Sequence, residues 1–285
     1  MGDLVAGDPD LTCWAWRPGM FGHTGEEGVG EYGGWMAVAR LVVDRWLVER
    51  RPAPDLADRL VCVWRGDLGS AELPLPDERL DLVWVDDGSL WLAGPETTSW
   101  SRGYPPGTTA VGVGFKPGVG PPTLGLAGSE VRDARVRLDE LWGDRRAREL
   151  AERVAAHPDD GGRARELEGA VRRLAARARP VDQVALEVAA RLNQPRTASV
   201  RDLSRAIGLS ERQLHRRCMA AFGYGPAVLG RILRLQRALQ LARSHQGPLR
   251  LAALAVAAGY FDQQHLAHEV RAVMGTTPTR LLCSR

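Results

Sequence analysis

The hydrophobic pattern of the chain changes character near residue 139. Between about residues 52 and 128, short apolar runs such as LVCVWRG, LDLVWV, LWLAG and TAVGVGF alternate with turns rich in Pro, Gly and Asp. Runs of this length bounded by turn residues predict β-strands, and DDG at 86–88 predicts a hairpin between two of them. We expect a small sandwich or barrel within a β-rich domain of residues 46–138. The glycine-rich residues 1–45 predict an irregular or disordered segment.

From residue 139 onward, apolar residues recur at the spacing of an α-helix. Leu150 and Val154 share one helical face, as do Leu167 and Val171. The pattern predicts a helical linker over residues 139–180. Its apolar stripes need burial, either within the same chain or in a homodimer, and the pattern does not choose between these arrangements.

The last third of the chain contains an internal repeat. The segments 203–226 and 254–278 share two spacings. In both, a leucine is followed five residues later by a glycine, and a second leucine is followed nine residues later by a second glycine. The second copy has one more residue in its turn. Helix, glycine turn, helix is the plan of a helix-turn-helix unit. We therefore predict an all-α domain over residues 181–285, with units at about 200–222 and 251–274.

Helix-capping residues mark the turn of each copy. Gly208 and Gly259 stand where the first helix should end, a position that favours a positive φ angle. Ser210 can begin the next helix, and Gln213, three residues later, completes a capping box. Asp262 is the equivalent cap in the second copy.

The second helix of each copy has an apolar face and a polar face. The residues expected to point into a core are Leu214, Cys218, Phe222, Leu266, Val270 and Val273. Those on the opposite face are Arg212, His215, Arg216, Gln263, Gln264 and His268.

The chemistry of the polar face favours DNA recognition. Arginine can bond bidentately to guanine, and glutamine to adenine, in the major groove. The first turns of a recognition helix are the part that reaches base edges. We therefore predict that these six polar residues contact bases. Ser210, Gln213 and Asp262 are predicted to support the helices, since the capping box explains Gln213 better than base contact does, and Arg217 is predicted to contact phosphate or solvent.

Charge is distributed unevenly along the chain. Residues 180–285 hold 15 arginines and 6 acidic residues, a net charge of +9, whereas residues 1–179 carry a net charge of −6. A basic region attached to an acidic remainder is typical of a module that binds a polyanion. Double-stranded DNA is the partner that this distribution predicts.

Few residues suggest catalysis or metal binding. Only His23 and His157 occur before residue 180, so a histidine-rich metal site of the cupin type cannot be assembled there. The four cysteines form no CxxC pair, and neither a GxSxG elbow nor a GxxxxGK phosphate loop is present. We predict no catalytic residues, no metal and no cofactor. No ligand-binding residue is assigned.

Some residues of the β-rich region have two explanations. Trp64, Trp84, Trp91 and Trp100 either fill a core or line an apolar ligand pocket, and the core is favoured. Lys116, in the glycine-rich GVGFKPGVG, either meets an anionic ligand or simply belongs to a turn, which is favoured.

The cellular location expected for the protein depends on two kinds of segment that the sequence lacks. No apolar run approaches the length of a membrane-spanning helix, and the first residues lack the basic and apolar parts of a secretory signal. We expect a cytoplasmic protein without a membrane partner.

The last hundred residues resemble the DNA-binding unit of the AraC/XylS family of bacterial transcription regulators. The resemblance rests on VRDLSRAIGLSERQLHRR, GYGPAVLGRILRLQRALQLA, LAALAVAAGYFDQQHLAHEVRAVMG and TTPTRL. It implies a long helix over about residues 226–244 that joins two units, whose recognition helices enter successive major grooves about 34 Å apart. It places the base-contacting positions on the same six residues. Ala267 departs from the family, which often has a polar side chain there.

The middle of the chain resembles an uncharacterised β-rich domain that precedes such DNA-binding units. The similar segments are LPLPDERLDLVWV, LAGPETTSW, VGVGFKPGVG and VRLDELWG. Glu78 departs from the pattern, which usually has glycine after Pro-Asp. Analogy with sugar-sensing family members implies a cupin-like effector sensor, an analogy of fold alone.

Together these patterns predict an α+β multidomain chain: a β-rich domain, a helical linker and a DNA-binding domain. The expected function is a sequence-specific transcription regulator controlled by a small-molecule effector or by homodimerisation, with RNA polymerase as a partner. One alternative is an enzyme or small-molecule-binding protein based on the β-rich domain. Another is a DNA-repair or architectural protein. Its alkyl-acceptor form needs a cysteine in a basic setting, which Cys13 and Cys62 lack.

Overall fold

The computed structural model describes residues 47–69, 77–97, 104–194, 199–245 and 250–283. The predicted irregular segment at 1–45 lies outside them. We call residues 47–175 the sheet region and residues 183–283 the helical region. Among the described helices, none combines the length and hydropathy needed to cross a bilayer.

Six described strands form one antiparallel sheet with the order β1-β2-β5-β3-β4-β6. The strands are β1 (Leu47–Arg50), β2 (Leu60–Asp67), β3 (Asp81–Val85), β4 (Leu90–Ala93), β5 (Thr109–Phe115) and β6 (Arg135–Arg137). The four apolar runs predicted as strands are β2 to β5, so that prediction is confirmed. The predicted hairpin is also present, because Trp84 of β3 pairs with Leu90 of β4 across a turn in which Gly88 has a φ of 85°.

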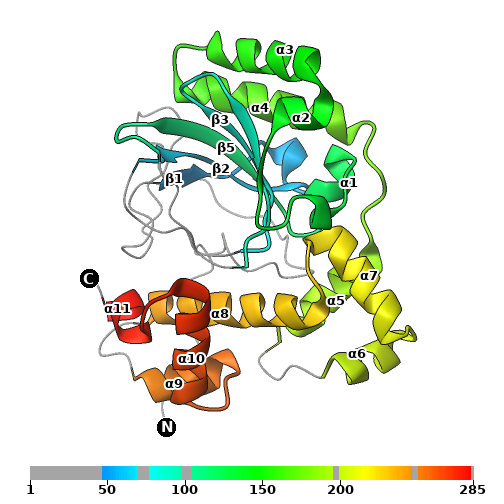
Figure 1. The fold of residues 1–285 in the computed structure, drawn as a ribbon, viewed down its shortest axis with the longest axis vertical. Coiled ribbons are helices and arrows are strands. Elements are labelled where there is room, and N and C mark those ends of the chain that lie inside the picture. The colour runs from blue at the N-terminus through cyan, green and yellow to red at the C-terminus, as the bar shows by residue number, and fades with distance from the viewer. Residues whose placement is uncertain (1–46, 70–76, 98–103, 195–198, 246–249, 284–285) are drawn as a thin grey trace.

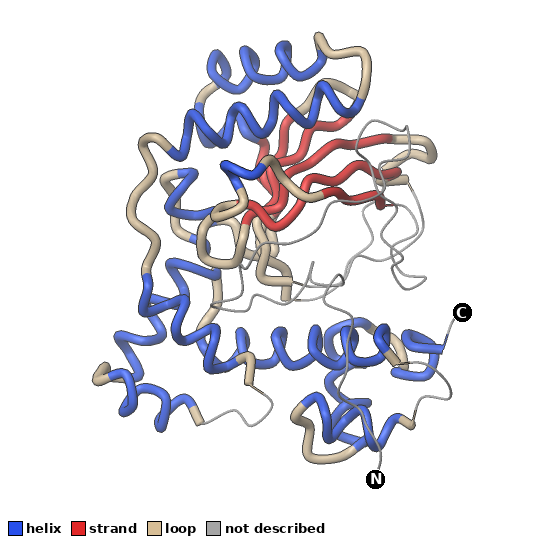
Figure 2. The backbone as a smooth tube through the Cα atoms, turned by 180° about the vertical axis from the view of Figure 1, so that it is seen from behind, coloured by secondary structure: helices blue, strands red, loops and turns tan. Residues whose placement is uncertain are grey.

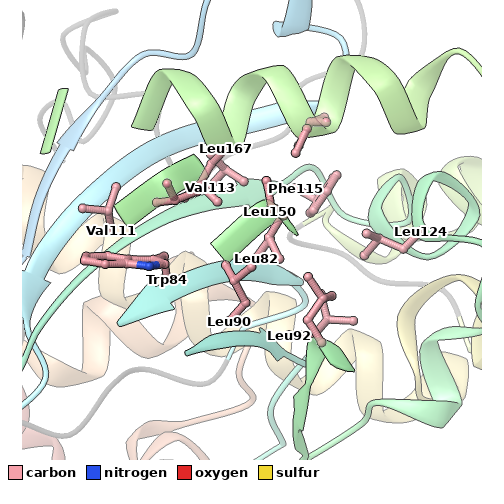
Figure 3. Close-up of a cluster of buried hydrophobic side chains, with 14 of the residues drawn as sticks. Leu82, Trp84, Leu90, Leu92, Val111, Val113, Phe115, Leu124, Leu150 and Leu167 are labelled. Atoms are coloured by element: carbon pink, nitrogen blue, oxygen red, sulfur yellow. The ribbon is translucent and has the colours of Figure 1, made fainter. Parts of the chain in front are cut away.

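The two faces of the sheet carry separate apolar clusters because side chains alternate along a strand. The first face carries Val63, Leu82, Trp84, Leu90, Leu92, Val111, Val113 and Phe115. The opposite face carries Cys62, Trp64, Val83, Val85 and Ala110. Figure 3 shows the first face with Leu150 and Leu167 packed against it.

Helices cover the first face. They are α2 (Leu138–Trp142), α3 (Asp144–Ala155) and α4 (Asp160–Ala175), and Figure 1 shows α3 and α4 lying along the sheet. Their stripes, including Leu150, Val154, Leu167 and Val171, are buried in the same core as the strands. Of the two arrangements left open, burial within the chain is therefore observed. The segment expected to be a linker contributes to the core, because its apolar face matches the apolar face of the sheet.

The sandwich or barrel expected from the strand pattern is not formed by the described residues. The apolar first face does not need a second sheet to cover it, because α3 and α4 already shield this face from water. The carboxylate of Glu168 on α4 accepts hydrogen bonds from Arg50 Nη2 (2.9 Å) and from the backbone N–H of Ala53 (2.7 Å). This buried pair fixes α4 over β1.

The alternation of valine and glycine in β5 makes room for a tryptophan. Trp64 of β2 lies opposite Gly112, and a Cβ atom on Gly112 would come within 2.4 Å of the Trp64 ring. Trp64 and Trp84 are both buried in apolar clusters, as the core explanation requires. Trp100 lies outside the described residues. Lys116 lies in the turn after β5, where its N–H donates to the Arg59 carbonyl.

The helical region contains two helix-turn-helix units joined by one long helix. Its helices are α5 (Gln183–Leu192), α6 (Val200–Ile207), α7 (Glu211–Phe222), α8 (Pro226–Ser244), α9 (Leu251–Ala258), α10 (Gln263–Met274) and α11 (Pro278–Cys283). Figures 1 and 2 show the α6–α7 and α9–α10 pairs at opposite ends of α8. Each pair belongs to its own apolar core. The repeat and the joining helix expected at 226–244 are thus confirmed.

The sheet region contacts the end of α7. It does so through α1 (Gly120–Leu124) and the short 3-10 helix η3 (Gly128–Glu130). The contact is close, since a Cβ atom on Gly128 would lie 2.6 Å from the backbone nitrogen of Gly223. Tyr224, 1% exposed, donates to the Asp77 carbonyl at 3.4 Å. The position of α7 is therefore fixed by the sheet region as well as by its own unit.

Candidate nucleic-acid interface

Helix α7 begins and ends as its sequence predicts. The preceding helix stops at Gly208, whose φ of 74° is left-handed. Ser210 Oγ accepts from the N–H of Gln213 (3.3 Å), and Gln213 Oε1 accepts from the N–H of Ser210 (2.9 Å). This is the predicted capping box, and it occupies the side chain of Gln213. The predicted capping box at the start of α7 is confirmed.

The faces of α7 are also as predicted. Leu214, Cys218 and Phe222 are buried in the core of the first unit, and burial raises the pKa of the Cys218 thiol to about 12. Arg212 and Arg216 are exposed. A buried apolar side and an exposed basic side fit a helix that lies on its own domain and faces a polyanion.

Two other polar residues of α7 contact the protein itself. His215 is exposed, but its ring lies against Gly225, where a Cβ atom would come within 2.6 Å of His215 Cδ2. Arg217 Nη1 donates to Asp182 Oδ2 at 2.7 Å, and Asp182 caps the first turn of α5. Arg217 therefore braces α7 against α5, a partner that the sequence pattern did not suggest.

The second unit repeats this plan with a longer turn. Three residues separate α6 from α7, and four separate α9 from α10. Gly259 ends α9 with a φ of 89°, and Asp262 Oδ1 accepts from the N–H of His265 at 2.7 Å. His265 packs edge-on against Tyr260, with ring centroids 5.2 Å apart. The predicted cap is confirmed, and His265 is a packing residue.

Helix α10 presents the amide side chains outward. Leu266, Val270 and Val273 are buried, whereas Gln263, Gln264 and His268 are exposed. Gln263 and Gln264 occupy the first turn of α10, the part of a recognition helix that reaches bases. Ala267, the departure from the family pattern, is half-buried.

One exposed aromatic residue was not singled out by the sequence reasoning. Phe261 is 88% exposed, directly before the cap of α10. It lies beside the N-terminus of α10, next to the exposed Gln263 and Gln264.

A buried ion pair holds α10 against α8. Glu269 is 5% exposed and accepts from Arg234 Nη2 (2.9 Å) and from the Tyr260 hydroxyl (2.8 Å). The Arg234 guanidinium also lies over the Tyr260 ring, 4.9 Å from its centroid. Burial raises the pKa of Tyr260, and Glu269 adds to that shift. The network holds α10 against α8 with its polar side chains exposed.

Comparison with protein families supports this geometry. Residues 203–282 match the family described as a helix-turn-helix domain. The C-terminal region is an AraC-type helix-turn-helix domain. The family resemblance predicted for this region is therefore confirmed, and the helix-turn-helix match supports DNA binding by it.

Other comparisons add less. No curated protein matches the chain. Among solved structures, an apo variant of ToxT from Vibrio cholerae is 10% identical with a TM-score of 0.46, covering 78% of this chain and 96% of that one. ToxT with bound unsaturated fatty acid is 10% identical with a TM-score of 0.40, covering 78% and 95%.

The described residues outside the helix-turn-helix units contain no group of three or more His, Cys, Asp or Glu side chains placed to hold a metal ion. Several buried charges of the sheet region instead form ion pairs. Arg79 lies 2.8 Å from Asp77 and 3.6 Å from Glu49. These contacts give the charged residues a structural role in the sheet region.

Proposed function

We propose that the chain is a cytoplasmic transcription regulator that reads two successive major grooves of double-stranded DNA with α7 and α10. The observation that supports this most strongly is the placement of the two helices at opposite ends of α8, each with its polar face exposed. In this proposal Arg212 and Arg216 read bases through α7, and Gln263 and Gln264 read them through α10. RNA polymerase would be the protein partner of such a regulator.

The remaining predicted contacts have narrower roles in this proposal. His268 lies one turn beyond the glutamines and extends the recognition face of α10. His215 contacts a base only if its ring leaves Gly225, so it ranks below the two arginines. Ser210, Gln213 and Asp262 hold the helix ends, and Arg217 positions α7 through Asp182.

Control by a small-molecule effector is a second part of the proposal. In the sheet region, Gly128 contacts Gly223 at the end of α7, and the Asp77 carbonyl accepts from Tyr224. An effector that changed the sheet region would therefore act on α7 through a direct contact. A homodimer through residues 139–178 loses its original argument, because those apolar stripes are buried inside the chain.

Selection from a random pool of duplex DNA tests the proposed function. The purified chain is incubated with the pool at fixed salt, and bound duplexes are sequenced, since affinity depends strongly on salt. We expect enrichment of two short motifs about one helical turn apart. A pool that stays random at every salt concentration would overturn the proposal.

A further inference from the structure

Helix α8 belongs to two cores at once. Leu229, Ile232 and Leu233 pack with α5 and α7 in the first unit. Two residues further along, Leu235, followed by Ala238 and Leu239, packs with α9 and α10 in the second unit. The change occurs between residues 233 and 235, without a break in the helix. Side chains in this stretch can contact both units.

Arg237 makes such a contact. Its Nη1 donates to the carbonyl oxygen of Ala258 at 2.9 Å, at the end of α9. Its Nη2 donates to the carbonyl oxygen of Leu192 at 3.4 Å and to Asn193 Oδ1 at 3.2 Å, at the end of α5. One guanidinium therefore connects the C-terminal end of α5, which packs in the first unit, to the C-terminal end of α9, which belongs to the second unit.

The chemistry of these partners suits a guanidinium. The last carbonyls of a helix lack partners within the helix and carry the negative end of its dipole. A planar, charged fork can donate to two such ends at once, whereas a lysine ammonium acts as a compact point charge. Burial lowers the pKa of Arg237, and the neighbouring Arg234 adds to that shift. These contacts therefore hold a desolvated cation between two helix ends.

We propose that Arg237 is a positioning residue that fixes the two helix-turn-helix units relative to each other and so sets the spacing of the DNA half-sites that the protein accepts. The proposal rests on the proposed function and deepens it. Each added base pair moves a half-site by about 3.4 Å and rotates it by about one tenth of a turn. A rigid pair of units cannot follow that displacement, whereas a loosened pair can.

The neighbouring arginines Arg234 and Arg231 of α8 do not serve the same purpose. Arg234 pairs with Glu269 of α10 and so holds only the second unit. Arg231 lies 3.7 Å from the same carboxylate and its side chain is 47% exposed. Arg231→Ala is therefore a matched control, because it removes one arginine from the same helix without touching the ends of α5 and α9.

The experiment compares the full-length parent with Arg237→Ala, Arg237→Lys and Arg231→Ala. The probes are duplexes that carry the two motifs selected by the parent, at the selected spacing and with one or two base pairs inserted or deleted. We expect the parent and Arg231→Ala to lose roughly tenfold or more in affinity on a change of one base pair, equivalent to about 1.4 kcal/mol. Arg237→Ala should lose less than about threefold on the same change. Its preference for each motif within the half-sites should stay as in the parent.

The outcomes separate the two proposals. If the parent selects no motif, the proposed function fails. If the parent selects two motifs and Arg237→Ala keeps the spacing preference of the parent, the role of Arg237 is overturned. Arg237→Lys covers the case in which the alanine variant does not fold. It keeps the charge without the fork, and it too should tolerate altered spacing; a lysine variant with the spacing preference of the parent would contradict the proposal.

Discussion

Glu78 of the sheet region lies beside Gln236 of α8, whose side chain lowers the pKa of the Glu78 carboxyl. Both residues line a crevice together with Ala189 of α5 and Arg237 of α8. The carboxyl oxygen Oε2 of Glu78 is buried and has no hydrogen-bond partner in the structure. Glu78 is also the position at which the chain departs from the glycine expected after Pro-Asp. The departure places a buried acid at the contact between the sheet region and the joining helix.

This contact predicts a dependence of stability on pH. Burial, reinforced by Asp77, raises the pKa of Glu78 from 4.5 to about 7, although Gln236 and Arg79 act in the opposite direction. Between these two pKa values the folded chain binds more protons than the unfolded chain, so the free energy of unfolding falls as pH rises. The loss begins above about pH 4.5 and is complete above about pH 7. Its upper limit is roughly 3 kcal/mol, at about 1.4 kcal/mol per pKa unit.

Glu78→Gln tests this dependence by urea unfolding at pH 5 and pH 8. The variant should be more stable than the parent at pH 8 and close to it at pH 5, because the amide never ionises. Asp81 has a pKa raised to about 6 by burial and remains in both proteins, so it contributes equally to each. If the difference in the free energy of unfolding between parent and variant is the same at pH 5 and pH 8, Glu78 is not buried in its uncharged form.

Base recognition predicts separate losses for the two helices. Arg212→Ala and Gln263→Ala should each cost roughly 1–3 kcal/mol at one base pair and relax the preference there, since each removes a bidentate contact. Competition binding with single-base variants of the selected duplex measures this. Glu211→Ala, an exposed change in the first turn of α7, serves as a control that removes no proposed base contact. If both variants rank all duplexes as the parent does, the base-contact assignment is wrong.

Removing the buried carboxylate of Glu269 should destabilise the second unit. Glu269→Ala leaves Arg234 without its partner in a largely buried position, and breaking such a pair costs roughly 3–5 kcal/mol. Tyr260→Phe deletes only the 2.8 Å hydrogen bond and should cost about 1 kcal/mol. Amide hydrogen exchange should show faster exchange in α9 and α10 of Glu269→Ala and little change in α6 and α7. If amide exchange became equally faster in both units, the effect of Glu269→Ala would not be confined to the second unit.

The contact between the sheet region and α7 has a steric requirement for glycine. In Gly128→Ala the new methyl group would meet the backbone of Gly223 at 2.6 Å, so η3 and α7 must separate. We expect a loss of roughly 1–3 kcal/mol, the usual cost of overpacking. Gly88→Ala, in the hairpin turn, is a control of another kind, since it strains a positive φ but meets no atom within 4 Å. Cleavage by protease of the connection at 176–182 should rise in Gly128→Ala and stay at the parental rate in Gly88→Ala.

The sequence by itself determined the local elements and the exposed faces of α7 and α10. Short apolar runs bounded by turn residues predicted β2 to β5, and helical spacing separated Leu214 and Leu266 from the exposed side chains of α7 and α10. The capping of α7 and α10 followed from Ser210 and Asp262. These features depend on residues within a turn or two of each other, so a linear pattern contains them.

Only the tertiary structure decided which surfaces meet. The stripes of α3 and α4 could have been buried in a dimer, but they cover the sheet of the same chain. Arg217 was predicted to contact phosphate or solvent, and its nearest charged partner is Asp182, 35 positions earlier in the chain. Arg237 carried no local signal, and Glu78 was noted only as a departure from the family pattern, because their partners lie on other elements. Long-range packing and the desolvation of charge assign such residues, and both depend on the folded chain as a whole.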